Sequence, residues 1–244
     1  MRTVIARSIG VLGELLITAA ALIGLFLVWQ LWWTDVEATR TQDRILTAVQ
    51  TGWTPAPTQP APQRRDPPPV SAPGAMHEVW GILHIPRFDR PAIPLAEGVS
   101  LPKVLNTQGA GHYPGTAMPG EVGNFSVAGH RTTYGKPFYE ISELTPGDPI
   151  IVETADAFYV YRVTSQQIIR PHQVEVIAPV PNQPGAAPNR RMLTLTACHP
   201  LFSARERYVV HAEFDYWTVR NDGLPPDLLP PELPEPAPNE TEGR

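Results

Sequence analysis

The chain has 244 residues, a formal net charge of −5 at pH 7 and one cysteine. This length suits one catalytic-sized domain with appended segments, and the mild negative charge gives no reason to expect nucleic acid as a partner. A single cysteine also excludes an internal disulfide framework.

The N-terminal segment predicts one membrane-spanning helix over residues 9–33. Glu14 is its one charged residue, and residues 15–34 are uncharged, a run of about twenty residues that is long enough to cross a bilayer as a helix. Three tryptophans gather at its far end, as in an interfacial aromatic belt: Trp29, Trp32 and Trp33. No convincing small-x-small cleavage site follows, so we expect an uncleaved signal anchor rather than a cleaved secretion signal.

The charges on either side of this span predict its orientation. Arg2 and Arg7 precede it, whereas Asp35 and Glu37 follow it. By the positive-inside rule, residues 1–8 lie in the cytoplasm and everything after the span lies outside the cell.

Residues 34–75 predict a connection between the anchor and a folded domain. A short juxtamembrane helix is expected over 35–50, and the proline-rich stretch 51–75 favours an extended polyproline-type spacer. At about 3.1 Å per residue, such a spacer reaches on the order of 70 Å and holds a domain away from the membrane. At the other end, residues 218–244 are expected to be a disordered tail rich in Pro and Glu.

Residues 76–217 predict a mainly β domain. Its apolar runs are short, β-branched or aromatic, and separated by Pro, Gly and Asp, which indicates a small closed barrel or a sandwich. The expected strands are Trp80–Ile85, Ala92–Leu95, Asn124–Gly129, Pro149–Glu153, Phe158–Ile169, Met192–Cys198 and Arg207–Tyr216. Short helical turns are expected at Ser100–Thr107 and Phe138–Leu144.

Cys198 is the first candidate for chemistry. Polar residues recur at a spacing of two up to the cysteine, at Thr194 and Thr196, so Cys198 shares the polar face of its strand. Pro200 should end that strand just past the thiol. An exported cysteine without a partner is either buried, joined to another molecule, or used in a reaction, and its place on the polar face favours a nucleophile.

Such a nucleophile needs a base and a group that stabilises an oxyanion. His130 follows Gly129 at the end of a predicted strand, where the glycine permits a close approach. Arg207 opens the strand that follows Cys198. If these two strands pair as antiparallel neighbours, the guanidinium lies beside the thiol and can hold an oxyanion. Arg205 has the same parity as Arg207, so strand alternation alone leaves the choice between them open.

Together these residues resemble the sortases, cysteine transpeptidases of Gram-positive cell surfaces. The similarity rests on the Thr-Leu-Thr-Ala-Cys segment followed by His-Pro, on the Ala-Gly-His-Arg segment at 128–131, and on an arginine opening the last long strand. The Gly-His-Tyr-Pro-Gly stretch at 111–115 is most like class E. Ala197 departs from the threonine that is common before the cysteine, but its side chain should face away from the site.

The resemblance implies a closed sortase-type β-barrel of about eight strands with short helical turns, and it implies that the protein is a monomer. It implies that Cys198 attacks the Thr-Gly bond of a Leu-Ala-x-Thr-Gly-type sorting signal, that His130 is the acid and base, and that Arg207 holds the oxyanion. Tyr113 and Thr196 are expected to contact substrate. The implied partners are surface proteins bearing such a C-terminal signal, a peptidoglycan precursor amine and the plasma membrane. No metal or cofactor is expected.

Two other functions are compatible with the same residues. A Cys-His peptidoglycan hydrolase or transpeptidase would act directly on the cell wall without a sorting signal. A non-enzymatic surface domain would simply bury Cys198 in its core.

Overall fold

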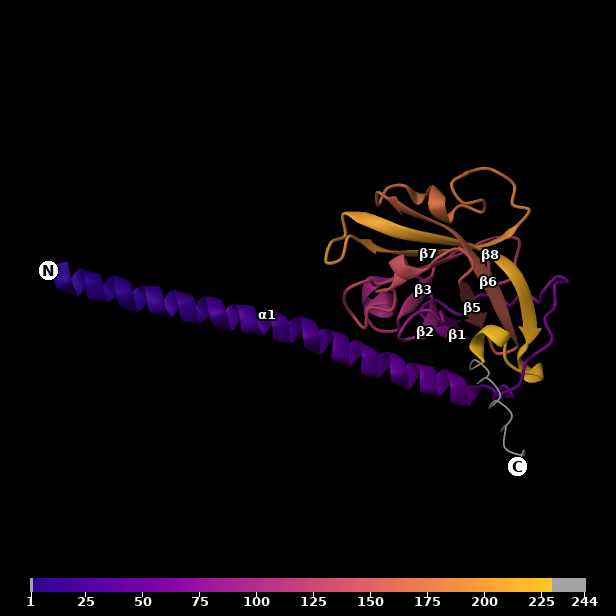
Figure 1. Cartoon of the computed structure of the whole chain (residues 1–244), viewed down its shortest axis with the longest axis horizontal. Helices are drawn as coiled ribbons and strands as arrows, with labels where there is room; N and C mark the ends of the chain where they lie inside the picture. Colours follow the sequence, from indigo (N-terminus) through magenta and orange to yellow (C-terminus); the bar gives the residue numbers. More distant parts are fainter. Residues whose placement is uncertain (1, 230–244) are drawn as a thin grey trace, which may run out of the picture.

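The computed structural model describes residues 2–229 and consists of one long helix and a β-barrel (Figure 1). Helix α1 spans Arg2–Gly52 without a break, which corresponds to a length of about 77 Å at 1.5 Å per residue. Among the described residues, α1 is the one helix long and apolar enough to cross a membrane. The predicted anchor and the predicted juxtamembrane helix are therefore parts of one continuous element.

The barrel is closed by eight strands in the order β1-β2-β3-β4-β7-β8-β6-β5, which confirms the expected fold. The pairs β2–β3 and β4–β7 are parallel, and the remaining pairs are antiparallel. The strands are β1 Val79–His84, β2 Ala92–Glu97, β3 Ala110–His112, β4 Gly123–Gly129, β5 Pro149–Glu153, β6 Ala157–Ile169, β7 Arg191–His199 and β8 Glu206–Val219. Only β3, which has three residues, is absent from the strands expected from the sequence.

Short helical turns join several strands. The turn expected at 100–107 is a single π-helical turn over Leu101–Leu105, and the one expected at 138–144 is a 3₁₀ turn over Ile141–Glu143. Further 3₁₀ turns, which were not expected, occur at Val174–Ile177, Arg220–Asp222 and Pro226–Leu228.

The first half of strand β6 is apolar on both faces. Tyr159 and Tyr161 belong to the main core inside the barrel. Phe158 and Val160 instead form a second cluster on the outside, where Ala56 and two leucines after β8 pack against them. Segments on both sides of the barrel domain in the sequence therefore cover part of its outer surface.

The proline-rich segment 53–75 is extended but does not form the free spacer that we expected. Ala61 and Arg64 make backbone hydrogen bonds to the segment after β8 and to β8 itself, and Ala61 is buried. Tyr159 donates its hydroxyl hydrogen to the carbonyl oxygen of Pro69 at 2.8 Å. The prolines keep this backbone extended. Because the barrel donates hydrogen bonds to its carbonyl groups, the segment lies along the barrel surface.

The expectation of a disordered tail over 218–244 is wrong for its first part. Val219 is the last residue of β8, and Asp227 accepts hydrogen bonds from Arg162 and Tyr216. Leu224 also exchanges backbone hydrogen bonds with the proline-rich segment. Residues 230–244 lie outside the described residues.

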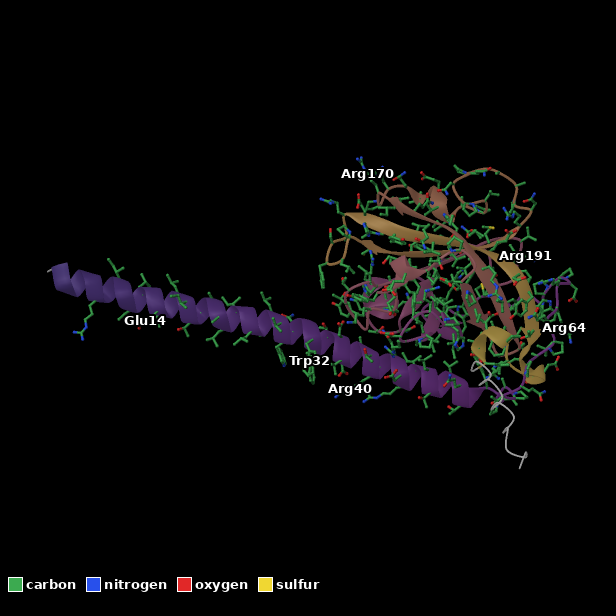
Figure 2. The ribbon with its side chains drawn as sticks, in the orientation of Figure 1. Glu14, Trp32, Arg40, Arg64, Arg170 and Arg191 are labelled. Carbon is green, nitrogen blue, oxygen red and sulfur yellow. The ribbon has the colours of Figure 1, made fainter. Side chains whose placement is uncertain are left out.

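The C-terminal half of α1 docks on the barrel beside the loop that follows β4. Gln42 is 1% exposed and donates to the carbonyl oxygen of Tyr134 at 3.1 Å. Arg90 pairs with Asp43 at 2.5 Å and also donates to Gln42. The apolar half of α1 extends away from the barrel, with Glu14 far from it and Trp32 near the start of the docked part (Figure 2). The barrel is therefore held close to the point where the apolar segment ends.

Candidate active site

Cys198 lies one residue before the end of β7 and is partly exposed. Leu193, Leu195 and Ala197 pack into the main core, so the cysteine and Thr196 have the opposite parity. The predicted alternation of β7 is thus confirmed. It keeps the thiol out of the core, at the edge of the barrel.

The neighbouring strand β8 brings Arg207 to the same place. The two strands pair antiparallel, with Cys198 directly opposite Arg207. Arg205 precedes β8 and has no partner in β7 in this register. The guanidinium Nη1 of Arg207 donates to the carbonyl oxygens of Ala204 at 2.8 Å and Glu206 at 2.9 Å, which ties this side chain to the loop between the strands.

His130 directly follows β4, which is adjacent to β7 in the barrel although β5 and β6 lie between them in the sequence. It follows Gly129, where a Cβ would lie 2.7 Å from the ring of Phe138. The glycine is needed because this aromatic ring, rather than a ligand, packs against the backbone. The ring of Tyr134 lies 5.1 Å from the His130 ring, centroid to centroid.

Asn106 fixes the orientation of the His130 imidazole. Its Oδ1 lies 2.7 Å from Nε2 of His130. An amide oxygen only accepts hydrogen bonds, so Nε2 carries the hydrogen and Nδ1 is the acceptor of the neutral ring. Burial lowers the pKa of His130 from its ordinary value. The neutral form is therefore favoured near neutral pH.

Tyr113 and Thr196 contact each other directly. Their hydroxyl oxygens are 3.0 Å apart. The Thr196 hydroxyl also donates a hydrogen bond to the carbonyl oxygen of Val127, at 3.4 Å. Since the threonine hydrogen is directed to that carbonyl, the tyrosine hydroxyl is the donor in the first bond. This bond links the loop after β3 to β7, next to the cysteine.

The Gly-His-Tyr-Pro-Gly stretch is built around the residues before Tyr113. A Cβ on Gly111 would lie 2.2 Å from the carbonyl oxygen of Gly98, so only glycine fits there. His112 is 1% exposed and its Nδ1 lies 2.8 Å from Oε2 of Glu97. These two residues hold the start of the loop, which places Tyr113 at the cleft.

One cleft of about 190 Å³ contains all five residues expected at the site: Tyr113, His130, Thr196, Cys198 and Arg207. Val99, Leu101 and Leu105 supply an apolar wall on one side. The described residues contain no group of three or more His, Cys, Asp or Glu side chains that could hold a metal ion. The arrangement combines a thiol, a neutral imidazole and a guanidinium, which is a set suited to acyl transfer through a thioester.

Nothing in the sequence patterns indicated that Asn106 and Tyr134 lie at the site, and those patterns assigned Arg131 no role there. Arg131 is 5% exposed and donates to Nδ1 of His199 at 2.8 Å. It also lies over the ring of Tyr208 at 5.3 Å, so it joins β4 to both strands of the site. Only Arg131 carried a signal, as a charged residue beside His130, because the other two contacts depend on the fold.

Comparison with known proteins identifies the family. The protein-family model of the sortase domain matches residues 83–215 of this chain. Sortase SrtE1 of Streptomyces coelicolor is 39% identical over 226 residues, which are 89% of this chain and 60% of that protein. Sortase SrtE2 of the same organism is 37% identical over 93% of this chain and 88% of its own length.

A solved structure agrees with this relationship. The SrtA sortase from Actinomyces oris is 45% identical, with a TM-score of 0.66, and the match covers 69% of this chain and 97% of that one. The resemblance expected from the Cys198, His130 and Arg207 motifs is therefore confirmed, and the two Streptomyces relatives agree with the likeness to class E. The chain belongs to the sortase family, whose members are cysteine transpeptidases.

Proposed function

We propose that this chain is a membrane-anchored transpeptidase that cleaves a Leu-Ala-x-Thr-Gly-type sorting signal between Thr and Gly. It then joins the protein to an amine of a peptidoglycan precursor. The observation that carries the proposal is the convergence of Cys198, His130 and Arg207 on one cleft from three different strands or strand ends.

In the first half-reaction, neutral His130 accepts the proton of the Cys198 thiol, and the resulting thiolate attacks the threonine carbonyl carbon. A tetrahedral intermediate forms, and its negative oxygen is held by the N–H donors of Arg207. Protonated His130 gives a proton to the glycine nitrogen as the C–N bond breaks, and the amine leaves. The product is a thioester between the threonine acyl group and the cysteine sulfur.

In the second half-reaction, the incoming amine attacks the thioester carbonyl. His130 accepts a proton from the attacking nitrogen, a new amide bond forms, and the C–S bond breaks to release the Cys198 thiolate. Tyr113 and Thr196, which share a hydrogen bond beside the cysteine, are the proposed contacts for the sorting signal. No net oxidation or hydrolysis occurs.

The proposed topology places the barrel outside the cell. The basic residues Arg2 and Arg7 lie before the apolar segment of α1 and the acidic residues Asp35 and Glu37 lie after it. This charge pattern supports an N-terminus in the cytoplasm. Substrate proteins and the precursor would then meet the cleft at the outer face of the membrane.

The test is a transpeptidation assay with the full chain in detergent. A fluorescent Leu-Ala-x-Thr-Gly peptide and a glycine-based amine should give a ligated product, and Cys198→Ala should give none. Release of the threonine acid without any ligated product would favour a hydrolase. Peptidoglycan cleavage without turnover of the peptide would point to a cell-wall enzyme of another kind.

A further inference from the structure

The hairpin loop between β7 and β8 carries two large apolar side chains that do not pack on the barrel. Phe202 is 80% exposed and Leu201 is 39% exposed. The backbone of Phe202 has φ of 60°, in a region that bulky residues rarely adopt. Strain of this kind at an exposed site is a reason to look for a function of the loop.

The hairpin has a defined position relative to α1. It is the part of the barrel that reaches furthest toward the N-terminal end of the helix (Figure 1). Along the helix axis its tip is level with Trp32 (Figure 2). Trp32 belongs to the tryptophan cluster that ends the apolar segment, where aromatic side chains mark the boundary between lipid tails and headgroups.

The docking of α1 fixes this position. The amide of Gly135 donates to Asp35 at 3.3 Å, close to the end of the apolar segment. About two turns later, Gln42 contacts both Tyr134 and Arg90. Because the barrel contacts α1 at several points, it is not separated from the apolar segment by a long, free spacer. The hairpin therefore stays on the membrane side of the barrel.

Cationic residues flank the apolar tip. Arg205 lies in the hairpin itself and is exposed. Arg170 is also exposed. It lies at the same end of the sheet, because the residue before it, Ile169, pairs with Arg207, and Figure 2 labels it there. Apolar side chains with neighbouring cations suit the interface of a membrane that contains anionic lipids.

We propose that the tip of the β7–β8 hairpin, Leu201 and Phe202, inserts into the headgroup region of the outer leaflet. The inference rests on the proposed membrane topology and adds a second contact to the anchor. Since Cys198 and Arg207 pair at the base of this hairpin, the contact would hold the cleft at the lipid surface. Substrates that are themselves tethered to the membrane would then reach the thiol without leaving the bilayer.

Site-directed fluorescence on the full chain tests the proposal. Cys198→Ala removes the native thiol, and Phe202→Cys then allows an environment-sensitive dye to be attached at the tip. Ala155→Cys is the matched control, because residue 155 is exposed and lies beyond the other end of β6, about 40 Å away at 3.3 Å per residue. Val28→Cys, on an exposed position of α1, reports on the anchor. Thermal unfolding of each variant checks that it folds.

Each labelled protein is placed in nanodiscs of phosphatidylcholine and phosphatidylglycerol with or without doxyl-labelled lipid. We expect blue-shifted emission and quenching by the doxyl lipid at positions 202 and 28, and neither effect at position 155. Water-like emission at 202 with lipid-like emission at 28 overturns the hairpin contact and leaves the anchor standing. Blue-shifted emission at 202 that the doxyl lipid does not quench indicates contact with protein and also overturns it. Transpeptidation by the wild-type chain in the same nanodiscs tests the proposed function separately.

Discussion

Replacing Asn106 by alanine should slow the reaction by removing the acceptor that orients His130. The 2.7 Å contact between Oδ1 and Nε2 would be lost, leaving a ring N–H without its partner. Removing one partner of a buried hydrogen bond costs about 1–3 kcal/mol, and His130 is only partly buried, so the lower part of that range applies. A loss of about 1–2 kcal/mol in the transition state corresponds to a decrease in kcat/KM of roughly 5- to 30-fold.

Asn106→Asp separates orientation from simple packing. It keeps an acceptor oxygen but places a negative charge beside the imidazole, which favours the protonated ring and raises the pKa of His130. In the wild-type chain, burial lowers that pKa. The limb of the pH–rate profile that belongs to His130 should therefore move to higher pH in the aspartate variant.

The assay is transpeptidation of the peptide substrate from pH 5 to 9, with Asn189→Ala as a control at an exposed asparagine outside the cleft. Full activity in Asn106→Ala, together with an unmoved profile in Asn106→Asp, would refute the role of this hydrogen bond.

Three further predictions follow from the same geometry. Arg207→Gln should lower kcat/KM by about 100- to 1,000-fold, whereas Arg205→Gln should change it little; equal losses would contradict the register. Gly129→Ala should destabilise the barrel by about 1–3 kcal/mol through overpacking against Phe138, and Phe138→Leu should recover part of the urea midpoint. Burial lowers the pKa of His211 to about 4, below its unfolded value near 6.5, so its stabilisation is complete above pH 6.5 and is lost as pH falls toward 4. That loss amounts to about 3 kcal/mol, and urea unfolding of His211→Gln should lack this part of the pH dependence.

The elements of the site that depend on local pattern could be predicted from the sequence. The alternation of β7 placed Leu195 and Ala197 in the core and Cys198 away from it, because side chains on a strand alternate whatever the strand pairs with. The same parity could not choose between Arg205 and Arg207. That choice needed the register of β7 against β8, which places Arg207 opposite the cysteine.

Contacts between distant segments could not be read from one sequence. Asn106 and His130 are 24 residues apart, and nothing in either local pattern indicates that they meet. The proline-rich stretch shows the same limit. Its composition correctly favours an extended backbone, but composition does not reveal that Ala61 and Arg64 pair with the barrel. The spacer was therefore mistaken for a free one.

The most direct test of the proposed chemistry is to trap the acyl-enzyme. The wild-type chain is mixed with a Leu-Ala-x-Thr-Gly peptide in the absence of an amine, quenched in acid and measured by intact-protein mass spectrometry. We expect a mass increase equal to the Leu-Ala-x-Thr acyl group, located at Cys198 by peptide mapping and released by hydroxylamine. No adduct, or an adduct on a residue other than Cys198, would contradict the assignment of the nucleophile.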